Sequence, residues 1–319
     1  MVKYQIENQE KNGGGTMRYC IVGAGAVGLS VAAALSKAGF QTDIVARGEN
    51  LAALKENGIR ILYGTKTETV SPVQAFCEAE YHGTPDVIFV SVKGYSLQSI
   101  LPLLKRITTE NTVVIPLLNI YGTGARLQKE LPYALVTDGC VYIAASKPAA
   151  GTVARQGKIF KIVFGVRQSG EYRPILAQIA DDLHFAGIEP LLSDFVQRDT
   201  LKKYAYVSPM AAAGLYFDAD ACAFQVEGAP RTLFMDLMRE IEALAKAMGC
   251  AFDIDIMQTN LDILDALSGD ASTSMQRDIR AGHASELEGL VFEPVRLGQK
   301  YSVLTAQYRK IAERFGFKE

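Results

Sequence analysis

Histidine is the scarcest chemically useful residue in this chain of 319 residues, which contains only His82, His184 and His283. So few imidazoles leave little room for a histidine-rich metal site, and we predict none. Any proton transfer is expected to use another residue type. The five cysteines form no C-x-x-C pair, a pattern typical of reduced thiols in a cytosolic protein. We therefore predict a cytoplasmic location.

The chain also has no excess charge and no long apolar run. Its 33 Lys and Arg residues nearly cancel 35 Asp and Glu residues, so the basic signature of a nucleic-acid-binding protein is missing. No apolar stretch approaches the roughly 18 residues that suggest a membrane span. We therefore predict a small-molecule partner and neither nucleic acid nor membrane as partners. A homodimer is compatible with the sequence, which does not specify the oligomeric state.

The first sixteen residues are polar and end in three consecutive glycines before Thr16. They lack the apolar segment of a signal peptide, and we interpret residues 1–16 as a flexible extension outside the fold. The remaining length favours two domains, because domains average about 150 residues.

The first half of the chain alternates between short apolar runs and helical patterns, which predicts an α/β domain. The expected strands cover residues 19–22, 42–46, 59–63, 86–92 and 112–118, and the expected helices cover 26–38, 51–57, 96–106 and 125–130. The runs 86–92 and 112–118 show no polar alternation. This is typical of strands buried on both faces of a parallel sheet.

The character of the sequence changes near residue 193. Residues 134–164 are extended, with turn signals at 147–148 and 156–157, and predict that the sheet ends in antiparallel strands. A helix at 172–185 and a strand at 190–192 follow. Beyond them we expect helices at 196–217, 231–248, 254–267, 286–298 and 303–315. The predicted domains are therefore an α/β domain at 17–193 and an all-helical domain at 194–319.

A glycine-rich motif lies between the first predicted strand and the first predicted helix. It has the pattern G-x-G-x-x-G and consists of Gly23, Ala24, Gly25, Ala26, Val27 and Gly28. Its glycines permit a tight turn and a close approach of the backbone to a pyrophosphate, while the helix N-terminus offers N–H donors. In this context the motif predicts dinucleotide binding by a doubly wound sheet of the Rossmann type.

The end of the second predicted strand bears on the choice of cofactor. An NAD site usually has an acidic residue there, and Asp43 lies too early to reach the ribose. Arg47 follows the strand instead and can make charge-assisted contacts to a 2′-phosphate, which favours NADP. The alternative is a solvated arginine in a surface loop.

Two polar residues follow two other predicted strands. Lys93 comes after the strand 86–92, and Asn119 comes after 112–118. Ligands of open α/β sheets bind at the carboxyl ends of the strands. We therefore predict that both residues contact a bound ligand, either the cofactor or the molecule bound beside it.

Several motifs, in order along residues 17–319, resemble those of the ketopantoate reductase family. They are the glycine motif with Arg47, the lysine-bearing segment 91–93 (SVK), and 118–122 (LNIYG), which looks like a variant of the family's asparagine-glycine segment. The sequence 201–204 (LKKY) resembles the start of the family's lysine-bearing helix. The most specific match is 274–282 (SMQRDIRAG) followed by 285–288 (SELE).

The resemblance implies NADPH-dependent reduction of 2-dehydropantoate (ketopantoate) to pantoate in pantothenate biosynthesis. By resemblance Lys203 is the general acid, and Glu286 orients Lys203 or binds the substrate hydroxyl. Asn119 would hydrogen-bond substrate or nicotinamide, and Ser274 would hold the carboxylate from a helix N-terminus. Lys93 would add positive charge near cofactor and substrate. A buried lysine suits the acid role because desolvation lowers its pKa.

Each of these residues also has a structural interpretation. Lys202 and Lys203 could form a solvated helix face. Ser274 could be a helix N-cap, and Glu286 could simply begin the next helix.

The chain departs from the family pattern in the expected substrate pocket. Family members often carry asparagines four and eight residues after the lysine, where this chain has Val207 and Ala211, and the glycine after Asn119 is replaced by Ile120. Lost hydrogen-bond donors can change specificity greatly. One alternative function is therefore a D-2-hydroxyacid dehydrogenase acting on a branched apolar 2-keto acid. Another is an NADP-sensing protein without catalysis.

Overall fold

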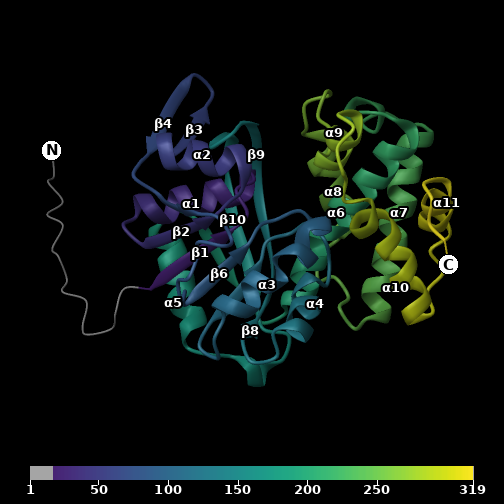
Figure 1. The fold of residues 1–319 in the computed structure, drawn as a ribbon. Helices are drawn as coiled ribbons and strands as arrows, with labels where there is room; N and C mark the ends of the chain where they lie inside the picture. The colour runs from purple at the N-terminus through teal and green to yellow at the C-terminus, as the bar shows by residue number, and fades with distance from the viewer. Residues whose placement is uncertain (1–16, 319) are drawn as a thin grey trace, which may run out of the picture.

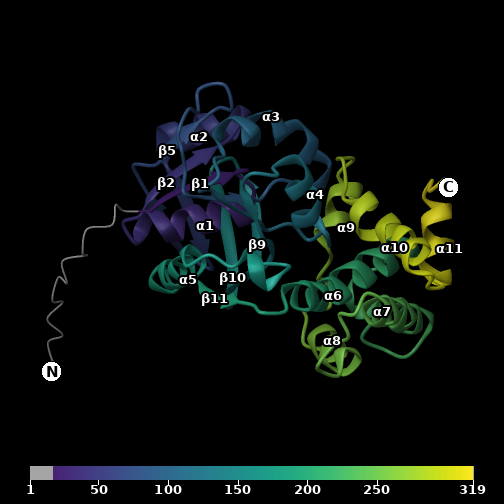
Figure 2. The ribbon, with the colours of Figure 1, turned by 90° about the horizontal axis from the view of Figure 1, so that it is seen from below.

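A computed structural model describes residues 17–318, so the extension expected at residues 1–16 lies outside the described residues. The chain forms an α/β part and a helical part that lie side by side, and Figures 1 and 2 show this division from two directions. The α/β part ends with β11 (Glu189–Leu192), and the helical part begins with α6 (Val196–Phe217). The proposed domain boundary near residue 193 falls between these two elements.

The first sheet has six parallel strands in the order β5-β2-β1-β6-β7-β8. Its strands are β1 (Arg18–Val22), β2 (Gln41–Val45), β5 (Gln74–Phe76), β6 (Val87–Val90), β7 (Val113–Pro116) and β8 (Leu135–Val136). The chain moves outward from β1 to β5 and then returns to β6 on the other side of β1. This reversal is the switch point of a doubly wound sheet. The predicted Rossmann-type fold is confirmed.

Both faces of this sheet are buried, which explains the continuous apolar runs of its strands. On one face, α3 (Leu97–Ile107) and α4 (Thr123–Glu130) pack against alternate strand residues such as Val22 and Val90. On the other face, α1 (Ala26–Lys37) and α5 (Ile175–Phe185) pack with Ile21 and Phe89. The remaining helix of this part is α2 (Gly48–Asn57).

The antiparallel strands form a second sheet, so the prediction that they finish the first sheet is wrong. This sheet has the order β11-β10-β3-β4, with β9 paired to β10. Its strands before β11 are β3 (Ile59–Tyr63), β4 (Lys66–Val70), β9 (Asp138–Ala149) and β10 (Thr152–Gly165). The parallel pairing of β10 with β3, far apart in sequence, creates the separate sheet.

Other local predictions differ from the structure for identifiable reasons. β9 continues through the turn signal at 147–148, and the hairpin turns three residues later at Gly151, whose φ is +61°. The signal at 156–157 marks an irregularity within β10, where the register with β9 shifts. The strands β4 and β5 were not expected. α5 begins at Ile175 and not at residue 172 because a short 3₁₀ turn and Pro174 precede it.

The helical part is organised around α6, whose bounds match the predicted helix. α6 contacts most of the later helices and also β9 and β10, and so joins the two parts of the chain. The later helices are α7 (Ala229–Ala247), α8 (Ile256–Asp265), α9 (Ser274–Arg280), α10 (Glu293–Tyr301) and α11 (Ala306–Arg314). The single helix expected at 286–298 is instead a π-helical turn at 288–292, labelled η4, followed by α10. No helix within residues 17–318 is long and apolar enough to cross a membrane.

Candidate functional site

The glycine loop between β1 and α1 is held by the end of β6. A Cβ on Gly23 would lie 2.9 Å from backbone atoms of Ser91 and Val92, and the φ of Gly23 is +114°. A Cβ on Gly28 would lie 1.9 Å from the carbonyl oxygen of Gly23. Ser91 Oγ donates to that oxygen at 2.9 Å. Two of the three glycines are therefore required by the packing of the protein itself.

Gly25 differs from the other two glycines of the motif. Within residues 17–318, and apart from the two adjoining residues, a Cβ placed on it would find no atom nearer than Ser91 O at 3.8 Å, and its φ of −80° is open to any residue. Its missing side chain therefore leaves the backbone approachable from outside at the N-terminus of α1, which has no side-chain cap. Ala24, Ala26 and Val27 pack partly against the core behind the loop. These features fit a bound pyrophosphate.

Arg47 lies at the same edge of the sheet as the glycine loop. It is exposed and lies two residues after the end of β2 and immediately before α2, while Gly23 N donates to Val45 O at the end of β2 at 3.1 Å. Its guanidinium is therefore free to meet a phosphate from solvent. Asp43 is engaged elsewhere, since its carboxylate accepts from the hydroxyl of Tyr81 at 3.0 Å.

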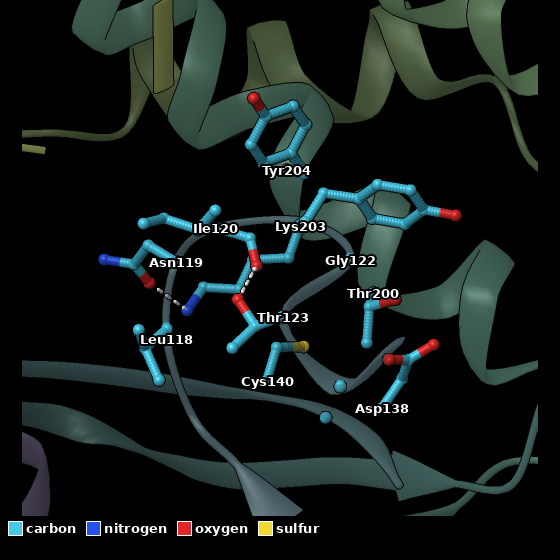
Figure 3. Close-up of a pocket in the computed structure, with 13 residues that line it drawn as sticks. Leu118, Asn119, Ile120, Gly122, Thr123, Asp138, Cys140, Thr200, Lys203 and Tyr204 are labelled. Atoms are coloured by element: carbon cyan, nitrogen blue, oxygen red, sulfur yellow. Dashed lines mark hydrogen bonds between the residues drawn. The ribbon is translucent and has the colours of Figure 1, made fainter. Parts of the chain in front are cut away.

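Lys203 and Asn119 meet where α6 faces the end of β7. Lys203 Nζ donates to Asn119 Oδ1 at 2.7 Å (Figure 3). It also donates to the carbonyl of Val141 in β9. The amine lies beside a small cavity of about 20 Å³ whose lining includes Thr123, Cys140 and Thr200. Burial lowers the pKa of Lys203, and Cys140 and then Glu286 oppose this shift only in part through their charges.

The neighbouring lysine has different partners. Lys202 Nζ lies 2.8 Å from Asp199 and 2.6 Å from Asp253, within the helical part of the chain. Neither lysine of the pair is therefore simply a member of a solvated helix face. Lys203 contacts the α/β part of the chain, whereas Lys202 contacts acidic residues of the helical part.

Lys93 and Glu286 form a second set of contacts between the two parts. The carboxylate of Glu286 is 4% exposed; its Oε1 accepts from Gly94 N at 3.1 Å, and its Oε2 lies 3.5 Å from Lys93 Nζ. Lys93 also lies 2.8 Å from Asp278 of α9. Burial would lower the pKa of Lys93, but these two acids outweigh it, so the pKa is raised. Glu286 thus contacts Lys93 directly, whereas the hydrogen bonds of Lys203 go to Asn119 and Val141.

Ser274 is the first residue of α9 and is half-buried. The interpretation of Ser274 as the N-cap is wrong, because Thr273 takes that place and accepts from Gln276 N at 3.2 Å. The hydroxyl of Ser274 is therefore not needed to cap the helix. Glu286 does stand immediately before a helical segment, as its structural interpretation expected, but its carboxylate is directed to Gly94 and Lys93.

The residues that depart from the family pattern occupy different environments. Val207 is half-buried, whereas Ala211 is completely buried in the helical core. Ile120 lies between the two parts of the chain. Its Cδ1 is 2.1 Å from where a Cβ on Gly94 would stand and 2.5 Å from where one on Gly289 would stand. Ile120 therefore fills a notch formed by two glycines.

Sequence reasoning missed Ser91, Asp278 and Val141 as contributors to this geometry. Ser91 could have been found, because a small hydroxyl residue directly after a buried strand is well placed to brace a neighbouring glycine loop. Asp278 lies in the quoted segment 274–282, but its pairing with Lys93 required knowledge of how the two parts are placed. Val141 contributes a backbone carbonyl, for which side-chain patterns give no signal.

Comparison with known proteins decides the family. Family models described as ketopantoate reductase PanE/ApbA and its C-terminal counterpart match residues 19–169 and 196–319. The chain belongs to the ketopantoate reductase family. This confirms the resemblance, and it places the chain in an oxidoreductase family with a Rossmann-type dinucleotide-binding domain.

Relatives of this ketopantoate reductase family member are moderately similar. A 2-dehydropantoate 2-reductase of Mesorhizobium japonicum is 28% identical over 307 residues, covering 89% of this chain and 92% of the relative. The uncharacterized oxidoreductase YkpB of Bacillus subtilis is 24% identical and covers 92% of this chain and 98% of its own.

Solved structures show the same fold. A 2-dehydropantoate 2-reductase of Methylococcus capsulatus has a TM-score of 0.83 at 21% identity, covering 94% of this chain and 96% of that one. A ternary structure of D-mandelate dehydrogenase with NADH and anilino(oxo)acetate has a TM-score of 0.85 at 20% identity. The match covers 93% of this chain and 96% of that one. These likenesses establish the architecture.

Replacing Gly25 by Ala is expected to weaken dinucleotide binding by about tenfold or more while leaving the thermal midpoint almost unchanged, because a methyl there meets the ligand and not the protein. Gly28→Ala is the matched variant from the same loop. It should lower both affinity and thermal midpoint, since its Cβ would clash with Gly23 O. Fluorescence titration with NADPH and NADH, together with thermal unfolding, measures both quantities. Equal loss of stability in the two variants would contradict this division of roles.

Proposed function

We propose that this protein reduces 2-dehydropantoate to pantoate with NADPH, as a cytoplasmic enzyme of pantothenate biosynthesis. The observation that carries the proposal is the amine of Lys203, which has a lowered pKa and is held by Asn119 at the carboxyl end of the parallel sheet. The glycine loop opens at the same edge of that sheet. With these assignments, the proton donor and the dinucleotide site would lie at the same edge of the parallel sheet.

The cofactor-binding residues fit a phosphorylated dinucleotide. The loop formed by Gly23, Gly25 and Gly28 would receive the pyrophosphate, and the exposed guanidinium of Arg47 would bind the 2′-phosphate. NADPH supplies the hydride when bound. The D-mandelate dehydrogenase structures contain NADH, so the preference for NADPH rests on Arg47.

Lys203 would act as the general acid of the reduction. Its ammonium gives a proton to the oxygen that becomes the hydroxyl, and a lowered pKa makes this transfer easier near neutral pH. Asn119 keeps the amine in place by accepting one of its hydrogen bonds. Its amide nitrogen can donate to the substrate or to the nicotinamide carboxamide.

The anionic substrate would be bound by groups at the junction of the two parts. Lys93 supplies positive charge, and Ser274 offers a hydroxyl that helix capping does not use. Glu286 would accept from the substrate hydroxyl, and its negative charge also partly sustains the ammonium form of Lys203. Lys93 must then be shared between the substrate and the acids Asp278 and Glu286.

A branched apolar 2-keto acid is a second candidate substrate. Val207 follows Lys203 by one helical turn, where many family members offer an amide, and Ile120 adds a second apolar side chain near Glu286. An apolar wall favours a substrate without a hydroxyl beyond the keto acid. D-mandelate dehydrogenase, with an aromatic 2-hydroxy acid as its named substrate, shares the fold.

Removing the amine in Lys203→Ala is expected to lower kcat with NADPH and ketopantoate by roughly 10²–10⁴-fold, with NADPH affinity nearly unchanged. The neighbouring Lys202→Ala is the control and should keep most of the activity.

In the wild-type enzyme, kcat should fall as pH rises through the pKa of Lys203, which lies below its ordinary 10.5, because only the protonated amine is an acid. Unchanged kcat in Lys203→Ala would exclude the acid role. NADPH binding without turnover by the wild-type protein would favour an NADP-sensing role.

The substitution Arg47→Asp is expected to shift preference from NADPH towards NADH by about 100-fold in kcat/KM ratio, because a carboxylate repels the 2′-phosphate and accepts from a ribose hydroxyl. Arg60→Asp is a control at another exposed arginine, located on β3. Steady-state rates with both cofactors give the ratio. If NADPH binds equally well to the Arg47 variant and the wild type, the 2′-phosphate assignment is wrong.

Comparing ketopantoate with 2-ketoisovalerate separates the two substrate candidates. A clear preference of the wild type for ketopantoate in kcat/KM supports the first, and the reverse preference supports the second. Val207→Asn is expected to raise the ratio of ketopantoate to 2-ketoisovalerate by about tenfold, because the amide offers a partner to the substrate hydroxyl. Val226→Asn, at a residue 61% exposed, should leave the ratio unchanged.

A further inference from the structure

The π-helical turn η4 begins two residues after Glu286 and contains two carbonyls that lack their ordinary helical donors. In an α-helix, the N–H groups of residues 293 and 294 would donate to the carbonyls of Gly289 and Leu290. Here Glu293 N donates to Glu288 O instead, and Pro294 has no N–H. Both residues are buried, so their carbonyls need other partners.

Two hydroxyls of α6 replace these missing donors. Tyr204 Oη donates to Gly289 O at 2.7 Å, and Ser208 Oγ donates to Leu290 O at 2.7 Å. The hydroxyl of Tyr308 lies 2.6 Å from Ser208 Oγ. Because Ser208 has one hydroxyl proton and gives it to Leu290, Tyr308 donates to Ser208. The three side chains are at most 2% exposed, so water does not compete for these bonds.

The same turn holds the backbone of Glu286. The N–H groups of Gly289 and Leu290 donate to Glu286 O at 3.1 and 3.0 Å. The carboxylate of Glu286 then reaches Gly94 N and Lys93 in the α/β part. A continuous chain of hydrogen bonds thus runs from α6 through η4 to Glu286 and on to Gly94.

We infer that Tyr204 and Ser208 are positioning residues that fix the carboxylate of Glu286 relative to the amine of Lys203. Tyr204 directly follows Lys203, and Ser208 stands one turn further along α6. One helix therefore carries the proposed acid and also anchors the segment that bears its acidic neighbour. The kinetic part of this inference rests on the proposed function, whereas the structural part does not.

The first test follows the amide of Gly94, which donates to Glu286 Oε1. Tyr204→Phe removes one hydroxyl and keeps the ring, and it should speed hydrogen exchange at Gly94 by about tenfold, as expected for the loss of one hydrogen bond. Glu286→Gln should also speed this exchange. The control is Tyr206→Phe, two residues along the same helix. The buried hydroxyl of Tyr206 has no partner among residues 17–318, so exchange at Gly94 should not change.

The second test is a double-mutant cycle on turnover with NADPH and ketopantoate or 2-ketoisovalerate, whichever the wild type prefers. Tyr204→Phe is expected to lower kcat by about tenfold to 100-fold, as misplacement of a site group does, with NADPH affinity unchanged. In the Glu286→Gln background the same substitution should have almost no further effect. If the two effects multiply, Tyr204 does not act through Glu286.

Ser208→Ala serves if Tyr204→Phe does not fold, because it leaves the bond of Tyr204 to Gly289 in place and removes the bonds of Ser208 to Leu290 and Tyr308. It should speed exchange at Gly94 in the same direction. Unchanged exchange at Gly94 in a folded variant would overturn the inference. Faster exchange together with no turnover of either keto acid by the wild type would leave the positioning network intact and reject the proposed function.

Discussion

The amine of Lys203 lies between the two parts of the chain and needs hydrogen-bond acceptors there. A desolvated ammonium without such partners costs free energy. Asn119 and the carbonyl of Val141 meet this need, and both belong to the α/β part. The helical part contributes the lysine itself. Neither half therefore contains the arrangement alone, and the lowered pKa of Lys203 is a property of their contact.

The ion pairs of the junction are also formed between residues of the two parts. Asp278 and Glu286 come from the helical part and pair with Lys93, and Glu293 pairs with Arg126 at 2.6 Å. Each pair joins an acid from one half to a base from the other. The orientation of the two halves is thus specified by charge as well as by packing.

The sequence allowed the parallel sheet, the glycine loop and α6 to be predicted, because each depends on contacts close in sequence or on continuous burial. The second sheet could not be predicted, since it depends on β10 pairing with β3 about ninety residues away. Asn119 and Lys203 could be selected by motif, but their hydrogen bond depends on how the two parts are placed. The π-helical turn had one local signal, Pro294 within an expected helix, because proline removes a donor and breaks helical continuity.

Ile120 makes the free energy of opening the junction depend on temperature. Its side chain is 8% exposed and rests in a notch between Gly94 of one part and Gly289 of the other. Any motion that separates the two parts exposes this side chain to water, at a cost on the order of 1–2 kcal/mol. Because hydration of apolar surface raises heat capacity, this resistance to opening weakens on cooling. The rate at which ligands exchange through this junction should therefore depend on temperature differently from the rate through a junction closed by ion pairs alone.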